Sequence, residues 1–187
     1  DDTVIVDTRS YAAFGGQYHA GAFSVNLQAN FPTFAGWVVP PDKDILLVTS
    51  GGSEVTEAVE WLRRVGLDRT IGYLNGGTPA SASAGLPLKH IPQLCSQELR
   101  DIVQRGKSIL VDVRAKSEYD TGHIKGAINI PFADLRTRHT ELDSSAETVI
   151  YCSSGARSSL GASILARSGF SRLLNAAGGL TGYRVAG

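Results

Sequence analysis

An internal repeat is the feature that most constrains how this chain of 187 residues folds. Residues 7–25 align with residues 112–130 without a gap, so that the Asp-x-Arg motif at Asp7 falls on the same motif at Asp112. Shorter matches follow towards the end of each copy, with small changes in loop length between them. Two copies of one unit of roughly 95–105 residues, the size of a small domain, explain this pattern better than chance.

The repeat divides the sequence into three segments. The first copy is predicted at residues 1–80 and the second at residues 95–187, with a linker at residues 81–94 that is rich in Pro, Ser, Ala and Gly. The first copy has no counterpart of residues 96–105, and the chain contains no Met. We therefore expect the first copy to be trimmed at its N-terminus within a longer protein.

The order of apolar runs and periodic segments predicts an α/β fold: two domains, each with a central, mainly parallel β-sheet flanked by helices. The expected strands are 3–9, 21–27, 44–50 and 70–77 in the first copy and 108–114, 126–131, 148–152 and 171–179 in the second. The expected helices are 55–66, 96–106 and 156–169. We place Trp61 on the core face of its helix, and we expect residues 30–43 to form a loop over the first core.

Charge and cysteine content exclude several classes of protein. The 18 Lys and Arg balance 18 Asp and Glu, which argues against a nucleic-acid binder and against a membrane-surface module. Two cysteines, Cys95 and Cys152, are too few for a disulfide framework, so free thiols in a reducing compartment, the cytoplasm, fit better. The four histidines show no metal-ligand spacing, and no metal or other cofactor is expected.

The candidate active site is the stretch that begins at Cys152. A buried strand ends at this cysteine, and four small residues and Arg157 follow where a helix begins. Because sites in parallel sheets form at the carboxyl ends of strands, loop amides and a helix N-terminus should converge on the sulfur. The helix dipole and the arginine charge would both favour the thiolate, which is the nucleophilic form.

Three blocks stand together in the second copy: the strand motif 111–114, the segment 119–131 with its Gly-His-Ile turn, and the loop 152–158. Together they resemble the rhodanese (sulfurtransferase) family, as a tandem pair. The resemblance implies that Cys152 takes a sulfane sulfur from thiosulfate or a persulfide such as glutathione persulfide, and passes it to a thiol or to cyanide. It also implies a cradle whose arginine binds the anionic donor and whose members are Ser153, Ser154, Gly155, Ala156, Arg157 and Ser158.

Other residues are expected to support this loop or to be inert. Asp112 and Arg114 close a neighbouring strand and are interpreted as a buried ion pair that holds loops in place. Gly178 and Gly179 are expected to mark a turn, and Cys95 to be an inert thiol. Loop length separates the site from cysteine phosphatases, which have five residues between cysteine and arginine where this chain has four. A phosphatase or arsenate reductase is therefore the weaker alternative.

The first copy departs from this pattern at the positions of the cysteine and the arginine. Thr49 or Ser50 stands in place of the cysteine, and Glu54 or Val55 in place of the arginine. We expect this copy to be inactive, with a role in packing or in partner recognition. Its residues 30–43 resemble the first rhodanese module of proteins that carry an upstream metallo-β-lactamase-like domain, which implies such a domain as a partner. The alternative function is accordingly a non-catalytic docking or regulatory module of a larger persulfide-metabolising protein.

Overall fold

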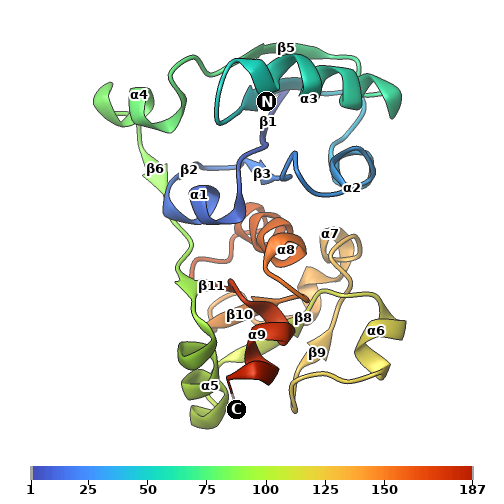
Figure 1. The fold of residues 1–187 in the computed structure, drawn as a ribbon, viewed down its shortest axis with the longest axis vertical. Coiled ribbons are helices and arrows are strands. Elements are labelled where there is room, and N and C mark those ends of the chain that lie inside the picture. Colours follow the sequence, from blue (N-terminus) through green and yellow to red (C-terminus); the bar gives the residue numbers. More distant parts are fainter. Residues whose placement is uncertain (1, 187) are drawn as a thin grey trace. The chain divides into compact units, whose positions relative to one another are not determined.

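The computed structural model describes residues 2–186, and the chain divides into two compact units between His90 and Ile91. Figure 1 labels most of the elements of both units. Each unit has its own parallel sheet with helices beside it, so the expected α/β fold is confirmed. Among the described residues, no helix has the length and apolar character that a membrane crossing requires.

Unit 1, which ends at His90, is built on a four-stranded parallel sheet in the order β3-β1-β4-β5. Its strands are β1 (Thr3–Asp7), β3 (Phe23–Ser24), β4 (Asp44–Val48) and β5 (Thr70–Tyr73). Its helices are α1 (Tyr11–Gly16), α2 (Phe31–Val38), α3 (Ser53–Arg64) and α4 (Gly77–Ser83). A separate antiparallel pair joins β2 (Tyr18–His19) to β6 (Leu88–Lys89).

Unit 2 is built on a five-stranded parallel sheet in the order β7-β11-β10-β8-β9. Its strands are β7 (Gln93–Leu94), β8 (Ile109–Asp112), β9 (Ile128–Asn129), β10 (Thr148–Tyr151) and β11 (Leu173–Ala176). Its helices are α5 (Ser96–Arg105), α6 (Lys116–Asp120), α7 (Leu135–Arg138), the short 3₁₀ helix η1 (His139–Glu141), α8 (Ala156–Arg167) and α9 (Gly179–Val185).

The central strand β10 explains why helices pack on both faces of this sheet. All four of its residues are buried, and successive side chains of a strand point to opposite faces. Val149 and Tyr151 belong to a cluster with Leu99 of α5 and Leu180 of α9. Ile150, on the opposite face, lies beside the backbone of α8. The sandwiched strand holds its carboxyl end, where Cys152 follows, in a fixed position.

The boundary between the two units lies inside the predicted linker, residues 81–94, and this segment contains regular structure. Residues 81–94 contain the end of α4 and two short strands, of which β6 pairs with β2 in unit 1 and β7 pairs with β11 in unit 2. Unit 1 therefore extends ten residues beyond the predicted end at residue 80. Strands of two residues have no periodicity to detect, and only their backbone hydrogen bonds to a partner strand define them.

Two expectations for unit 1 are wrong. Trp61 is only half-buried and lies under the guanidinium of Arg64, 4.4 Å from its ring centre, while the next residue, Leu62, is fully buried. The expected loop at residues 30–43 contains α2, which has Pro32 in its first turn and buries one apolar stripe. Proline is compatible with the first turn of a helix because the amide there has no intrahelical partner.

Candidate active site

Cys152 lies at the carboxyl end of β10, and its side chain is buried, with 1% of its surface exposed. The sulfur accepts a hydrogen bond from the backbone N–H of Gly155 at 3.1 Å. It also accepts one from the hydroxyl of Ser158 at 3.5 Å. Because α8 begins at Ala156, the sulfur sits at the N-terminus of a twelve-residue helix. The sulfur therefore faces hydrogen-bond donors and the positive end of the helix dipole.

The loop after the cysteine is held from its other side by α9. The carbonyl oxygen of Cys152 accepts the N–H of Leu180 at 2.7 Å, and that of Ser153 accepts the N–H of Thr181 at 3.2 Å. These two hydrogen bonds fix the backbone of Cys152 and Ser153 against α9, while the N–H of Gly155 points to the sulfur. The first turn of α9 therefore orients the cradle.

Two glycines make this close approach possible. A Cβ atom at Gly155 (φ 102°) would overlap the carbonyl oxygen of Ala177, and one at Gly179 (φ 54°) would overlap the carbonyl oxygen of Cys152. Both residues also adopt left-handed backbone angles that only glycine adopts without strain. Gly179 was expected to mark a turn only. It also forms the surface against which the candidate loop packs.

Arg157 is fully engaged by a residue that the sequence did not indicate. Its Nη1 and Nη2 donate to the two carboxylate oxygens of Glu118 in α6, at 2.6 and 2.8 Å. Nη2 also donates to the hydroxyl of Ser153 at 3.0 Å. The hydrogen bonds from Arg157 lower the pKa of the Glu118 carboxyl to about 2, and the carboxylate raises the pKa of Arg157. Both groups are charged throughout the neutral range.

The structure brings together most, but not all, of the expected cradle. Ser153 contacts Arg157, while Gly155 and Ser158 contact the sulfur. Ser154 is exposed and Ala156 is partly buried. Within residues 2–186, neither of these two donates to Cys152, so their part in a cradle stays a prediction.

Asp112 and Arg114 form the buried ion pair that was expected beside the loop. The guanidinium donates to both carboxylate oxygens, with an Nε–Oδ1 distance of 2.9 Å and an Nη2–Oδ2 distance of 2.6 Å. Nη2 also reaches the carbonyl oxygen of Gly122 at 2.9 Å. The pair thereby ties the end of β8 to the turn that follows α6. His123, the histidine of the Gly-His-Ile turn, stacks on the ring of Tyr119 with 3.7 Å between the ring centres.

Strand register in unit 1 settles which residues correspond to this loop. Asp7 pairs with Val48 in unit 1, just as Asp112 pairs with Tyr151 in unit 2. The next residue is Thr49 in one unit and Cys152 in the other. Counting on from there, Glu54 takes the position of Arg157. The hydroxyl of Thr49 donates to the carbonyl of Gly51 at 3.0 Å, and the carboxylate of Glu54 accepts the amide of Ser50 at 2.9 Å.

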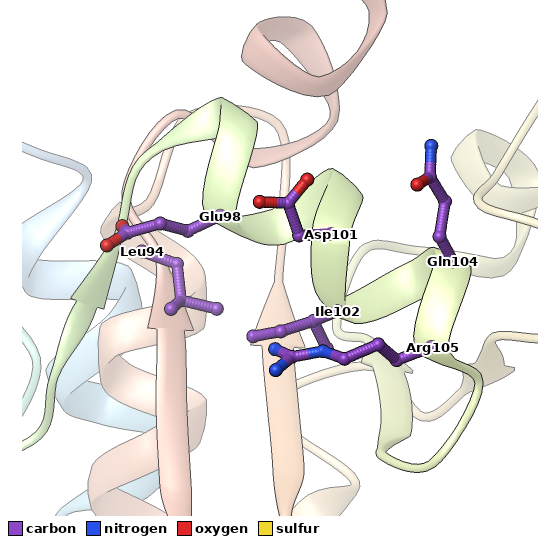
Figure 2. Close-up of a pocket in the computed structure, with 6 residues that line it drawn as sticks. All are labelled: Leu94, Glu98, Asp101, Ile102, Gln104 and Arg105. Carbon is purple, nitrogen blue, oxygen red and sulfur yellow. The ribbon is translucent and has the colours of Figure 1, made fainter.

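A hollow in unit 2 lies away from the loop that follows Cys152. Figure 2 shows the residues that line it along α5. Its volume is about 520 Å³. Its lining residues are Leu94, Glu98, Asp101, Ile102, Gln104 and Arg105. None of them carries a thiol or a hydroxyl group, and none belongs to the loop after Cys152. Among the described residues, no group of three or more His, Cys, Asp or Glu side chains is arranged to hold a metal ion.

Comparison with known proteins assigns the second unit to a family. The model of the rhodanese-like domain matches residues 96–186. A sulfurtransferase of Allochromatium vinosum is 36% identical over 75 residues, which cover 40% of this chain and 70% of that protein. Thiosulfate sulfurtransferase PspE of Escherichia coli is 36% identical over 70 residues, covering 36% of this chain and 67% of PspE. The chain belongs to the rhodanese-like family.

Two other relatives are longer than the matched region. YrkF of Bacillus subtilis is 31% identical over 106 residues, which cover 56% of this chain and 55% of YrkF. YqhL of the same organism is 37% identical over 73 residues, covering 39% of this chain and 58% of YqhL. The chain thus spans little more than half the length of these two relatives.

Proposed function

We propose that unit 2 is a sulfurtransferase that carries a sulfane sulfur as a persulfide on Cys152. The observation that carries this proposal is the position of the Cys152 sulfur. It lies at the end of β10 and at the start of α8, and it accepts hydrogen bonds from the amide of Gly155 and the hydroxyl of Ser158. The sulfurtransferases among the relatives support transfer of sulfur as the reaction class.

The reaction proceeds in two balanced steps. The Cys152 thiolate attacks the outer sulfur of thiosulfate or of a thiol persulfide, so that an S–S bond forms to the enzyme. The S–S bond within the donor breaks at the same time, and sulfite or a thiolate leaves with the electron pair. An acceptor thiolate or cyanide then attacks the outer sulfur and releases the Cys152 thiolate, with no external oxidant or reductant. The donors at the helix N-terminus stabilise the negative sulfur in both states.

We also propose that unit 1 is a rhodanese-like domain without this activity. Its counterpart of Cys152 is Thr49, whose hydroxyl is a far weaker nucleophile at neutral pH and cannot form a persulfide. Its counterpart of Arg157 is Glu54, which would repel an anionic donor. Both cysteines of the chain are free thiols, which fits a proposed cytoplasmic setting.

Intact-mass spectrometry after incubation with thiosulfate tests the main proposal. The chain should gain about 32 Da, the mass of one sulfur, and a thiol reductant should remove it. The Cys152→Ser variant should gain nothing. The matched control is Cys95→Ser, which removes the exposed thiol at the start of α5 and should load like the unmodified chain. Full loading of the Cys152→Ser variant would overturn the proposal.

A further inference from the structure

The carboxylate of Glu118 covers the one charged side chain of the candidate loop. Arg157 is the only ionised side chain in residues 153–158, and two of its nitrogens donate to Glu118 at 2.6 and 2.8 Å. The side chains are 24% exposed for Arg157 and 36% exposed for Glu118, so the pair is reachable from solvent. The positive charge that would attract an anionic donor is therefore largely cancelled before any donor arrives.

Unit 1 lacks both members of this pair. Glu118 is the third residue of α6, and Ala13 is the third residue of α1, at the same distance from the Asp-x-Arg motif. The position of Arg157 is taken by Glu54, which binds the amide of its own loop. The two positions change together in the copy that has lost its cysteine. This indicates that the pair serves the thiol chemistry, in addition to the hydrogen bond by which Glu118 accepts the backbone N–H of Ala115 at 3.2 Å and caps α6.

We propose that Glu118 sets the donor selectivity of the site by charge: it discriminates against doubly charged donors such as thiosulfate and favours donors with one negative charge, such as the persulfides of thiols. The inference rests on the proposed function of Cys152. The physical reason is that a second negative charge gains little from an arginine that is already neutralised, while the carboxylate repels it. Glu118 affects the donor in two ways: it neutralises the charge of Arg157, and its own negative charge repels the donor.

Steady-state kinetics of Glu118→Gln with two donors test this. The glutamine keeps the shape and one acceptor oxygen for Arg157 but removes the charge. The donors are thiosulfate, with two negative charges, and the methanethiosulfonate anion, with one. Each delivers its outer sulfur by breaking one S–S bond, and the leaving groups are sulfite and methanesulfinate. We expect the KM for thiosulfate to fall about tenfold and that for methanethiosulfonate about threefold, with kcat within twofold.

A matched control is Glu141→Gln in η1. Glu141 also binds an arginine through both oxygens, at 2.6 and 2.9 Å, but its partner is the surface residue Arg138. This variant should leave both KM values unchanged. A second variant, Glu118→Ala, introduces the residue that unit 1 has, and it should shift the ratio of the two KM values in the same direction.

The outcomes separate this inference from the proposed function. If Glu118→Gln and Glu118→Ala change kcat/KM for both donors by one factor, Glu118 only positions Arg157 and the inference is wrong. The inference is also wrong if kcat falls while both KM values stay unchanged. If neither donor loads sulfur onto Cys152 in the unmodified chain, the proposed function itself is wrong.

Discussion

The loops after β4 and β10 occupy the same register in their sheets but differ in their first residue and in the sign of the charge five residues later. In unit 2 a cysteine is followed five residues later by an arginine, and in unit 1 a threonine is followed five residues later by a glutamate. The arginine binds a carboxylate from a neighbouring helix, whereas the glutamate binds the amide of Ser50 in its own loop. In the function proposed above, this small number of side chains distinguishes the active loop from the inactive one on a scaffold that both units keep.

The scaffold itself is recognisable in one repeated contact. Arg9 and Arg114 each bind the carboxylate two residues earlier, with Nη2–Oδ2 distances of 2.6 Å in both units. Each arginine also donates to a backbone carbonyl eight residues further along. Because unit 1 keeps this arrangement without the cysteine, the buried ion pair belongs to the fold and not to the reaction.

The largest expected effect comes from breaking that ion pair in either unit. Arg114→Ala would leave the fully buried carboxylate of Asp112 without its partner, which costs about 3–5 kcal/mol of the free energy of unfolding. Arg9→Ala should cost a similar amount through Asp7. Urea denaturation of both variants measures this. A loss below about 1 kcal/mol in either unit would show that the two contacts are not equivalent.

A smaller effect should distinguish the two glycine turns. Gly77 and Gly179 both have left-handed backbone angles, with φ of 60° and 54°. A Cβ at Gly77 would lie 3.6 Å from its nearest atom, in Pro79, whereas one at Gly179 would overlap the backbone of Cys152. We expect Gly77→Ala to cost about 1–2 kcal/mol of stability, the strain of the left-handed angle alone.

Gly179→Ala should cost more than Gly77→Ala, because the loop after Cys152 must also move. That movement should lower the rate of sulfur loading by thiosulfate, while Gly77→Ala leaves the rate unchanged. Thermal unfolding and mass-detected loading of both variants check the difference. Equal costs in the two units, with equal loading rates, would mean that the turn before α9 does not support the cradle.

An effect of comparable size, on activity rather than on stability, concerns the loop arginine. Arg157→Ala leaves the carboxylate of Glu118 unpaired beside the negative sulfur and the anionic donor. We expect kcat/KM for thiosulfate to fall roughly ten- to a hundredfold, which corresponds to about 1.4–2.7 kcal/mol. Adding Glu118→Gln to this variant should restore part of the loss. If the double variant is no better than Arg157→Ala alone, the repulsion by Glu118 is not the cause.

The sequence was sufficient to predict the helices and strands with strong periodicity, and the site residues that lie close together in the chain. The buried runs of β8 and β10 and the start of α8 predicted where Cys152 would lie. Glu118 could not be identified, because it lies 39 residues before Arg157 and only the folded sheet brings them together. One signal was present in the repeat: Glu118 falls on Ala13, in the copy that also lacks the arginine.

Two other features could be identified only from the backbone of the folded chain. The choice between Thr49 and Ser50 depended on strand register, which composition does not reveal. The support of the loop by Gly179 depended on how closely α9 approaches the backbone of Cys152. Short pairings such as β6 with β2 have too few residues to leave a pattern in the sequence.

The most direct measurement is site-resolved mass spectrometry of a chain in which the two loops exchange their nucleophile. The double variant Cys152→Ser with Thr49→Cys moves the only loop thiol into unit 1, where Glu54 replaces the arginine. After treatment with thiosulfate, the unmodified chain should carry one additional sulfur, about 32 Da, on Cys152. The double variant should carry none at position 49. A sulfur at position 49, loaded at the rate of Cys152, would contradict the conclusion that only the loop of unit 2 supports the chemistry.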